Sequence, residues 1–362
     1  MRIGIDSRMI SMTGIGTYLR NLIDGIGELD KENEFVLFMH PSDIENFKSP
    51  GTNFKVVPSK SSPYSVSEQI LFPKKVSNLE LDLIHYPHYF QPFFGITPVV
   101  VTIHDMIHQI FPHFCPSYLH WKISWLMIKR VVKKSRIILT VSKNSAQDIK
   151  ERLHIGNEKV RVIYNSLPKN WGRNSNKEIP VKLKSFLAER SYFLYVGNHK
   201  LHKNIPLLLQ AFSNLRKMNK QICLVLTGEN KRFKKLISSL SIESSVYFLG
   251  KIDLDVLQAI YSNAHALVLP SLYEGFGMPL IEAMTFGCPV ISSNTSSLPE
   301  IYGNASMSFN PKSGEELAHC MKKLVEDKNM REDLKKKGFT QSNKFSWNKC
   351  AEETFKVYSS CL

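Results

Sequence analysis

Two glutamates, Glu274 and Glu282, lie eight positions apart in a segment whose residue types suit an elongated, phosphorylated ligand. A carboxylate accepts charge-assisted hydrogen bonds from two neighbouring hydroxyl groups, so each glutamate is a candidate for holding a sugar or a ribose. Gly275 and Gly277 allow the backbone beside Glu274 to approach a ligand closely. The residues after them predict a helix, and the amide groups and dipole at a helix N-terminus attract phosphate. The segment therefore predicts a diphosphate site with a hydroxyl-binding carboxylate on either side.

The elements that position these glutamates are predicted by residues 265–293, which indicate a strand, a tight loop, a helix and a second strand. Pro270 ends the first apolar run, because proline cannot continue the pairing of a central strand. Pro279 suits the first helical turn, where no backbone donor is lost, and Gly287 suits the helix C-terminus. The predicted helix is about two turns long. Its N-terminus should face the crevice beyond the carboxyl ends of the strands, where parallel sheets bind ligands.

The run E-G-F-G-M-P-L-I-E-A-M, which begins at Glu274, resembles the E-x7-E signature of the family-four retaining glycosyltransferases, which have the GT-B fold. The resemblance implies that Glu274 contacts the donor sugar and that Glu282 binds the ribose of a nucleotide-sugar donor. It also implies that the backbone of Gly275, Phe276 and Gly277 lies against sugar and phosphate. In this family the anomeric configuration is retained by same-face attack that the leaving phosphate assists, without a metal or a cofactor. We therefore count Glu274 among the catalytic residues as a donor binder and not as a nucleophile.

Asp253 and Asp255 form a D-x-D pattern, which binds a metal ion in a different class of glycosyltransferases. Here the pattern opens a predicted helix, DLDVLQAIYSNA, where aspartate is expected at the N-cap or in the first turn. We therefore predict no metal site.

A second strand-to-helix connection, YVGNHKLHKN, carries basic residues that suit a phosphate. Lys203 at its end provides a compact positive charge. The segment resembles the V-G-R-x-x-x-x-K-N loop of the same family, whose Arg and Lys neutralise the departing diphosphate, so Lys203 is predicted to be catalytic and donor-binding. Asn198 stands where that Arg is common and is predicted to contact the donor. Whether Lys200 or His199 supplies the missing positive charge is left open.

The first half of the chain contains a shorter glycine pattern, Gly14-Ile15-Gly16, between the first predicted strand and a predicted helix. A dinucleotide fingerprint would need a third glycine near position 19, which is Leu19. The resemblance instead implies a glycine-rich loop at Gly14 and Gly16 that faces the donor phosphate across a cleft, with an ordinary tight turn as the alternative.

Histidines follow two further predicted strands. His104 and Asp105 end the run VVVTIHD, which resembles the T-I-H-D segment of bacterial members, whose histidine approaches the transferred sugar. His104 is therefore predicted to be catalytic and Asp105 to lie on the acceptor side. His85 and His88 follow another strand and are predicted to shape the acceptor pocket, with ordinary loop packing as an equal alternative.

Short apolar runs alternate with helical patterns along the whole chain, which predicts buried parallel strands. The first series is RIGID, EFVLFMH, FKVVP, DLIHY, PVVVTIHD and RIILTVS, and the second is YFLYVG, ICLVLTG, SVYFLG, HALVLPS and PVISS. We predict the α/β class and the GT-B fold, in which two Rossmann-like domains have parallel sheets facing across a cleft. The predicted parts are an acceptor-side domain at 1–176, a nucleotide-sugar-binding domain at 177–345, and a helix at 346–362 that begins at the N-cap Ser346 and packs toward the first domain.

The formal net charge of +15 predicts a polyanionic partner, namely a nucleic acid, an anionic membrane surface or phosphorylated substrates. Residues 118–136 combine two tryptophans with six lysines and arginines, which suits a membrane surface or, alternatively, a core helix with a solvated basic end. There is no signal-peptide pattern and no apolar run of about 18 residues that could span a membrane. The six cysteines form no C-x-x-C pair. We therefore expect a cytoplasmic protein at the inner face of the cell membrane.

The resemblance covers nearly the whole chain and implies a metal-independent hexosyltransferase. The N-terminal and T-I-H-D segments resemble bacterial mannosyltransferases, which favours mannose from GDP-mannose, and the basic, Trp-containing helix favours a lipid-linked saccharide acceptor in polysaccharide or O-antigen biosynthesis. Two alternatives stay open. A sugar-nucleotide epimerase or hydrolase of the same fold would turn over without an acceptor. A nucleic-acid-binding protein would explain the charge, but no nucleic-acid motif is present.

Overall fold

The computed structural model describes residues 1–12, 14–61, 63, 65–92, 95, 97–168, 171 and 178–362. The chain divides into two compact units. Unit 1 comprises Met1–Ser166 together with Ser346–Leu362, and unit 2 comprises Leu167–Phe345. The predicted domain boundary between residues 176 and 177 lies outside the described residues.

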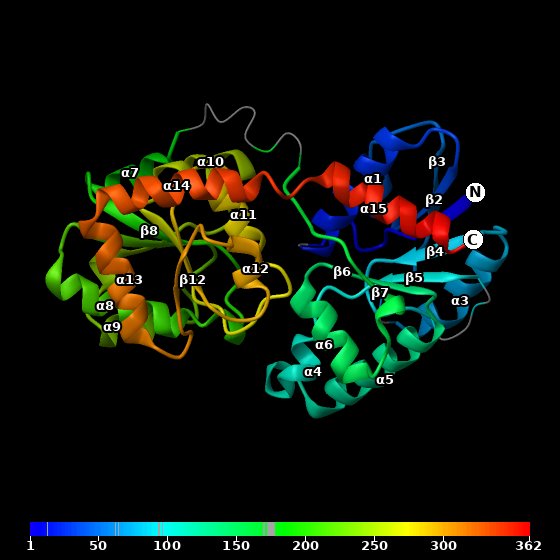
Figure 1. Cartoon of the computed structure of the whole chain (residues 1–362), viewed down its shortest axis with the longest axis horizontal. Helices are drawn as coiled ribbons and strands as arrows, with labels where there is room; N and C mark the ends of the chain where they lie inside the picture. The colour runs from blue at the N-terminus through cyan, green and yellow to red at the C-terminus, as the bar shows by residue number, and fades with distance from the viewer. Residues whose placement is uncertain are drawn as a thin grey trace. The chain divides into compact units, whose positions relative to one another are not determined.

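Unit 1 is built on a seven-stranded sheet in the order β3-β2-β1-β4-β5-β6-β7, and all its strand pairs are parallel. The central strands are buried along nearly their whole length, because helices cover both faces of the sheet (Figure 1). The strands are β1 (Arg2–Asp6), β2 (Glu34–Met39), β3 (Phe54–Pro58), β4 (Leu83–Tyr86), β5 (Val99–Thr102), β6 (Ile137–Thr140) and β7 (Val160–Val162).

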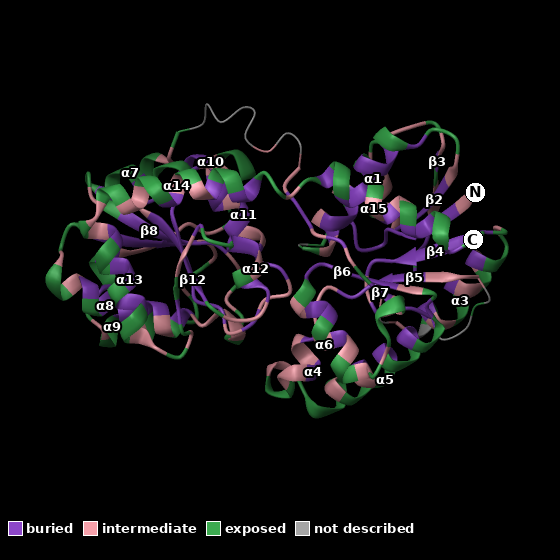
Figure 2. Ribbon diagram, viewed as in Figure 1, coloured by how far each residue is buried: buried purple, intermediate pink, exposed green. Residues whose placement is uncertain are grey.

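The helices of unit 1 bury two separate apolar clusters, one against each face of the sheet, as the purple residues of Figure 2 show. One cluster joins α1 and α15, which lie side by side in blue and red in Figure 1, and the other joins α3, α5 and α6. The helical elements are α1 (Ile15–Leu29), α2 (Pro41–Ile44), α3 (Val66–Ser77), α4 (Ile107–Ile110), η1 (Pro112–Phe114), α5 (Tyr118–Lys134), α6 (Lys143–Leu153), η2 (Asn157–Lys159) and α15 (Trp347–Ser360).

Unit 2 repeats the plan with a six-stranded parallel sheet in the order β10-β9-β8-β11-β12-β13. The carboxyl ends of β9, β8 and β11 are therefore neighbours at one edge, which is where parallel sheets present their ligand-binding loops. The strands are β8 (Ser191–Tyr195), β9 (Ile222–Leu226), β10 (Val246–Phe248), β11 (Ala266–Leu269), β12 (Val290–Ser293) and β13 (Met307–Phe309).

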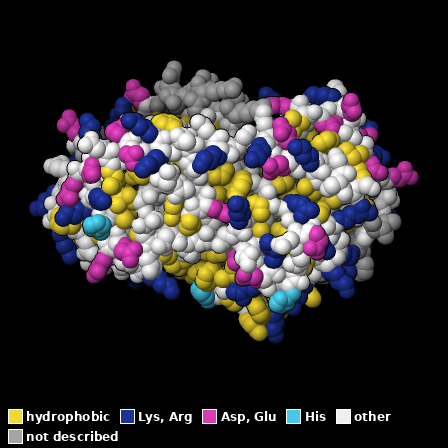
Figure 3. All heavy atoms as spheres, viewed as in Figure 1, with side chains coloured by type: hydrophobic (Ala, Val, Ile, Leu, Met, Phe, Trp, Pro, Cys, Tyr) yellow, Lys and Arg dark blue, Asp and Glu magenta, His cyan; other side chains and the backbone are white. Residues whose placement is uncertain are grey.

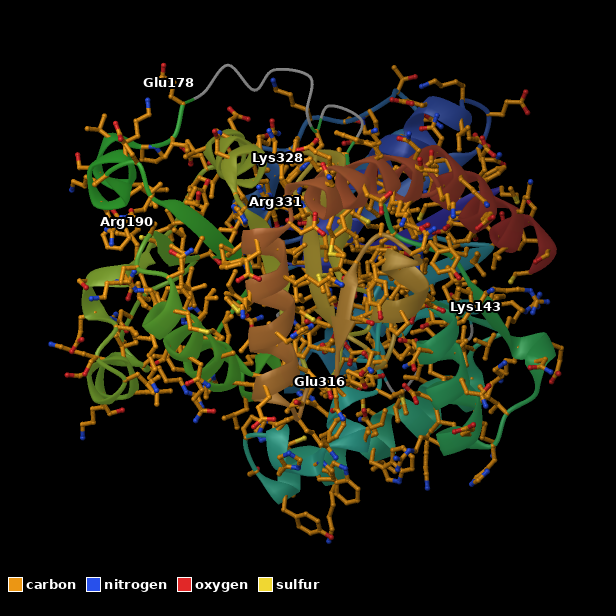
Figure 4. All side chains as sticks on the ribbon, turned by 60° about the vertical axis from the view of Figure 1, so that its left-hand side comes forward. Lys143, Glu178, Arg190, Glu316, Lys328 and Arg331 are labelled. Atoms are coloured by element: carbon orange, nitrogen blue, oxygen red, sulfur yellow. The ribbon has the colours of Figure 1, made fainter. Side chains whose placement is uncertain are left out.

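The helices of unit 2 pack on this sheet, with α8, α9 and α13 sharing one apolar cluster and α11 packing against α10, α12 and α14. Ser313 caps α13 by accepting the Glu316 amide, and the Glu316 carboxylate accepts from the Asn310 amide; Glu316 is labelled in Figure 4. The helical elements are α7 (Val181–Leu187), η3 (Leu201–Lys203), α8 (Ile205–Met218), α9 (Lys234–Ser239), η4 (Glu243–Ser245), α10 (Leu254–Asn263), α11 (Met278–Thr285), α12 (Leu298–Tyr302), α13 (Gly314–Glu326) and α14 (Lys328–Ser342).

The strands predicted from apolar runs are all present, but β7 and β13 are not among the predictions. Each has only three residues, lies at a sheet edge and is incompletely buried, so neither produces an apolar run. The terminal helix α15 does begin after Ser346, but the Ser346 side chain makes no capping hydrogen bond. No helix in the described part of the chain is long and apolar enough to cross a bilayer.

Candidate functional site

The loop between β11 and α11 has the geometry that its prolines and glycines predict. The strand ends at Leu269, just before Pro270, and Pro279 lies in the first turn of the helix. Gly277 at the N-cap has a φ of 104°, and a Cβ there would lie 2.8 Å from the Leu298 side chain, so a larger residue would be strained and crowded. α11 therefore begins where the sequence predicts, with its N-terminus at the carboxyl edge of the sheet.

Glu274 in this loop is held by hydrogen bonds to both of its carboxylate oxygens. The Lys203 ammonium lies 2.7 Å from Oε1 and 2.8 Å from Oε2, and the Ser271 hydroxyl donates to Oε1 at 2.6 Å. The two charged side chains are only 11% and 12% exposed, so water screens their attraction incompletely. The structure therefore joins two predicted site residues, from neighbouring strand ends, into one ion pair.

The backbone around Glu274 is fixed by two serines that sequence reasoning missed. The Glu274 amide donates to the Ser296 hydroxyl at 2.9 Å, and the Ser297 hydroxyl donates to the carbonyls of Glu274 and Phe276 at 2.9 and 3.0 Å. Both serines follow β12, the strand next to β11. The signal in the sequence is the hydroxyl-rich run SSNTSS directly after a buried strand.

Lys203 lies in a loop that is hydrogen-bonded to the connections after both neighbouring strands, β9 and β11. The Gly197 amide donates to the Thr227 hydroxyl beyond β9 at 3.0 Å, and the Leu272 amide beyond β11 donates to the His202 carbonyl at 2.7 Å. Asn204 adopts a φ of 56°, and its amide group donates to the carbonyls of Pro270 and Pro311 at 3.1 and 2.8 Å. The asparagine of the K-N pair thus ties the Lys203 loop to its neighbours.

Glu282 lies in the middle of α11, partly buried, and accepts a 2.6 Å hydrogen bond from the Tyr261 hydroxyl of α10. Burial raises the pKa of Glu282 to about 6, although the hydrogen bond from Tyr261 acts in the opposite direction. Tyr261, which sequence reasoning did not single out, fixes one carboxylate oxygen of Glu282. The carboxylate is held in one orientation and keeps further acceptor positions.

The raised pKa of Glu282 predicts a pH-dependent stability. Because the folded chain binds this proton more tightly than the unfolded chain, the free energy of unfolding decreases as the pH rises through about 6. Glu282→Gln cannot ionise, so relative to the wild type it should gain about 1 kcal/mol between pH 5 and pH 7.5. Urea unfolding at the two pH values measures this difference. Asp253→Asn, an exposed carboxylate before α10, is the control, and an equal pH response of both variants would contradict the assignment.

The residues considered for a second positive charge lie in the same loop. Asn198 is exposed, and its side-chain oxygen accepts a 3.2 Å hydrogen bond from the Lys200 amide. The His199 ring bonds to the Thr227 carbonyl at 2.7 Å and packs edge-on against Phe233 and Phe248. His199 is therefore engaged within unit 2, whereas the Lys200 side chain is exposed.

In unit 1, Gly14 and Gly16 lie at the start of α1, the helix that follows β1. A Cβ at Gly16 would lie 2.3 Å from the Ile10 carbonyl oxygen, so only glycine fits this close approach. Gly14 is exposed, with a φ of 73°, and its carbonyl accepts the Tyr18 amide at 2.9 Å. Gly16 thus serves the close packing of its loop and Gly14 supplies a positive φ, and a role of either toward a donor phosphate stays a prediction.

His104 is partly buried just beyond β5. Its Nε2 bonds to the Pro87 carbonyl at 3.0 Å, and the Tyr18 ring meets its ring edge-on at 5.0 Å. Burial lowers the pKa of His104, while the Asp105 carboxylate and the Pro87 carbonyl oppose this effect. The Asp105 carboxylate itself accepts the Ile107 amide at 3.0 Å. His104 is thus a fixed, predominantly neutral imidazole at a strand end.

The prediction that His85 shapes an acceptor pocket is wrong. His85 is completely buried, its Nδ1 bonds to the Tyr358 hydroxyl at 2.6 Å, and its Nε2 bonds to the Thr102 hydroxyl at 2.8 Å. Thr102 also bonds to the Tyr18 hydroxyl at 3.1 Å. Burial lowers the pKa of His85 to about 3, so the ring is neutral. His85 is an internal link between β4, β5 and α15.

His88 lies beyond β4 and is partly exposed. Its Nδ1 accepts the Phe90 amide at 3.2 Å, and its ring packs on Tyr89 with centroids 4.2 Å apart. Burial and the nearby His104 and His108 lower the pKa of His88 to about 3. Its acceptor role stays a prediction.

No cluster of three or more histidines, cysteines, aspartates or glutamates that could hold a metal ion occurs among the described residues. Asp253 takes the N-cap position of α10 and Asp255 its first turn. Both therefore lie where helix-start aspartates are expected.

The two parallel-sheet units, with Glu274 and Lys203 beyond neighbouring strands of the second and Glu282 in α11, agree with the architecture that the E-x7-E resemblance implies. The sequence model described as "Glycosyltransferase Family 4" matches residues 12–169, and the one described as "Glycosyl transferases group 1" matches residues 178–341. The chain belongs to the family-four glycosyltransferases and has their GT-B fold.

Among similar proteins, the O-antigen chain mannosyltransferase B of Escherichia coli is 28% identical over 371 residues, covering 96% of each chain. The O-antigen chain mannosyltransferase RfbU of Salmonella typhimurium is 29% identical over 246 residues, which cover 64% of this chain and 66% of that protein. The solved sucrose-phosphate synthase of Thermosynechococcus elongatus shares the fold with a TM-score of 0.77 and 20% identity, over 99% of this chain and 98% of that one. Anabaena HepE, in complex with UDP and glucose, has a TM-score of 0.76 and 18% identity, over 99% of this chain and 100% of that one.

Proposed function

We propose that this glycosyltransferase moves a hexose from a nucleoside-diphosphate sugar to a saccharide, with retention of configuration and without a metal. The observation that carries the proposal is the ion pair of Lys203 and Glu274 just before α11, together with Glu282 about one turn into that helix. Lys203 offers positive charge for a diphosphate, and Glu274 and Glu282 offer two separate carboxylates that can bind hydroxyl groups.

The donor diphosphate lies against the start of α11 and Lys203, which stabilise the negative charge that develops as it departs. Glu274 accepts hydroxyl groups of the transferred sugar, and Glu282, oriented by Tyr261, accepts those of the ribose. The bond between the anomeric carbon and the phosphate oxygen breaks while a bond to the acceptor oxygen forms on the same face. The acceptor proton passes to the departing phosphate oxygen.

The first unit supplies the acceptor side in this proposal. His104 approaches the transferred sugar, and the loop of Gly14 and Gly16 faces the donor phosphate. Asp105 and His88 lie on the acceptor side, beyond β5 and β4. Two O-antigen mannosyltransferases among the relatives support mannose, from GDP-mannose, as the transferred sugar and bacterial surface-polysaccharide assembly as the process.

A thermal-shift comparison of GDP, UDP, ADP and dTDP tests the donor site, because a ligand that binds only the folded chain raises its melting temperature. We expect GDP to give the largest shift. Glu282→Ala should remove most of that shift, whereas Asp253→Ala should keep it. No shift with any of the four nucleotides would contradict the proposed function.

We propose further that the acceptor is lipid-linked and that the chain reaches it from the inner face of the cell membrane through α5. Tyr118, Leu119 and Leu126 of α5 are 65%, 65% and 63% exposed. The Lys122 and Lys129 ammonium groups lie 4.7 and 4.8 Å from the centres of aromatic rings on the same helix. Along the lower edge of Figure 3, where Figure 1 places α4 and α5, hydrophobic side chains lie beside basic ones. Exposed apolar and cationic groups together suit an anionic lipid surface.

Vesicle sedimentation tests this surface. Replacing Lys129, Lys133 and Lys134 by Gln should lower binding to phosphatidylglycerol vesicles at least about tenfold, because each basic residue near such a surface contributes about 1 kcal/mol. The matched control replaces three exposed lysines elsewhere in unit 1, Lys48, Lys349 and Lys356. Binding of the α5 variant equal to that of the wild type would exclude α5 as the lipid contact.

A further inference from the structure

The ion pair of Lys203 and Glu274 gives the proposed donor site no net positive charge. Lys203 gives both of its short contacts to the Glu274 carboxylate, so the pair is neutral as a whole. Asn198 is uncharged and turned to its own loop, and the His199 ring is bonded to the Thr227 carbonyl. A nucleoside diphosphate carries several negative charges, and charge-assisted hydrogen bonds hold it best. Two cations could supply further positive charge at this edge of the sheet, namely Lys200, which is exposed in the Lys203 loop, and Arg232 in the neighbouring connection.

Arg232 lies beside the same loop, in the connection that follows β9. Its Nη1 donates a 2.9 Å hydrogen bond to the His199 carbonyl, and its side chain is exposed. β9 pairs directly with β8, and β8 with β11, so the Arg232, Lys203 and Glu274 connections are three neighbours in a row. One contact to a carbonyl leaves a guanidinium with further N–H donors in a planar fork that suits phosphate oxygens.

The adjacent Lys231 differs from Arg232 in its partner. Its ammonium lies 2.7 Å from the Glu229 carboxylate, and both side chains are largely exposed. Of these two neighbouring cations, Arg232 is therefore the one bonded to the loop that carries Lys203. The packing of Gly228 against the His199 ring, where a Cβ would lie 3.0 Å from that ring, keeps the two connections close.

We propose that Arg232 binds the nucleoside diphosphate of the donor. It would supply the positive charge that Asn198, which stands where the family loop commonly has an Arg, does not provide. The inference rests on the proposed function, because it assumes a nucleotide donor at this edge of unit 2. The His199 carbonyl orients the guanidinium, and the remaining N–H groups meet the phosphate oxygens. Arg232 thus adds the net positive charge that the neutral pair of Lys203 and Glu274 does not provide.

Titration of the full chain with GDP, UDP, ADP and dTDP, each compared with its nucleoside, tests Arg232. Arg232→Ala should lower the affinity for the diphosphate that the wild type binds by about tenfold. This is the loss expected for one charge-assisted hydrogen bond at an open site. The substitution should leave weak nucleoside binding unchanged. Lys231→Ala is the matched control and should change the affinity less than about twofold. Because Arg232 is exposed, the melting temperature of the unliganded variant should equal that of the wild type.

A second variant tests the charge itself. Asn198→Arg, introduced into Arg232→Ala, should restore most of the lost diphosphate affinity, because Arg232 is bonded to His199, the residue next to Asn198. Equal affinities of Arg232→Ala and Lys231→Ala, with a wild type that binds, would overturn the role of Arg232 and leave the proposed function standing. If Asn198→Arg did not restore the diphosphate affinity, this would likewise argue that Arg232 does not bind the diphosphate. A wild type that binds none of the four diphosphates would overturn both proposals.

Discussion

Glu274→Ala is expected to lower the rate of sugar transfer at least about 100-fold, the scale of losing one preorganised electrostatic contact at a reacting centre. In the proposed mechanism the substitution removes the acceptor for the sugar hydroxyls, and it also removes the partner of Lys203. A lysine without its carboxylate is free to leave the position at which it meets the departing phosphate. Release of nucleoside diphosphate in the presence of acceptor measures the effect, and kcat should fall more than KM rises, since the contact strengthens in the transition state.

The pairing of Glu274 with Lys203 gives this prediction an internal check. Because the two side chains act as a unit, the double variant Glu274→Ala, Lys203→Ala should be only slightly slower than the slower single variant. Glu326→Ala, an exposed glutamate of α13 with a 3.8 Å ion pair, is the control and should keep its rate within about twofold. Fully multiplicative losses in the double variant would show that the two residues act independently.

Arg8→Met is expected to lower the free energy of unfolding by about 3–5 kcal/mol, because it strands two buried carboxylates. The Arg8 guanidinium lies 2.7 Å from the Asp6 carboxylate and 2.5 Å from that of Glu68, and all three side chains are at most 6% exposed. It also donates to the Ser61 carbonyl at 2.9 Å and covers the Phe72 ring at 3.8 Å. Burial alone would lower the pKa of Arg8, but the two carboxylates raise it above its ordinary value. Arg8 is therefore charged at every pH at which the fold exists.

Urea unfolding followed by tryptophan fluorescence reports on this loss, since Trp121, Trp125 and Trp347 all lie in unit 1. The matched control is Arg2→Met in β1, the strand that ends two residues before Arg8. The pair of Arg2 with Glu34 is about one third exposed and should contribute less than about 1 kcal/mol. Adding Asp6→Asn and Glu68→Gln to Arg8→Met should recover part of the stability, because no uncompensated charge remains. Equal losses of unfolding free energy for Arg2→Met and Arg8→Met would show that the buried triad contributes no more to stability than the exposed pair.

The local geometry around Glu274 and Glu282 could be predicted because the rules that set it act over a few residues. Pro270 ends a strand, Gly277 permits a positive φ, and Pro279 is tolerated in the first helical turn. These effects do not depend on the rest of the chain. The alternation of apolar runs with amphipathic segments likewise predicts parallel sheets without any knowledge of strand order.

The partners of the site residues depend on strand order and were not predictable in this way. Lys203 was expected to meet a phosphate, yet it is bonded to Glu274, 71 positions away, because β8 and β11 are neighbours in the sheet. The sequence predicts that His85 follows a strand like other site residues, but it lies within β4 and is bonded to Tyr358, 273 positions later. The sequence predicts that the helix at 346–362 packs toward the first domain, but no local pattern indicates that its Tyr358 will bond to His85.

The return of α15 to unit 1 means that this unit is assembled from two stretches of sequence with a whole second unit inserted between them. During synthesis on the ribosome, unit 2 has all of its residues before unit 1 receives the helix that carries Tyr358 and Trp347. Until then the apolar side of α1 and the His85 ring lack their covering partner. The order of translation therefore completes unit 2 first, and unit 1, which bears His104, gains its last packing layer only when α15 emerges.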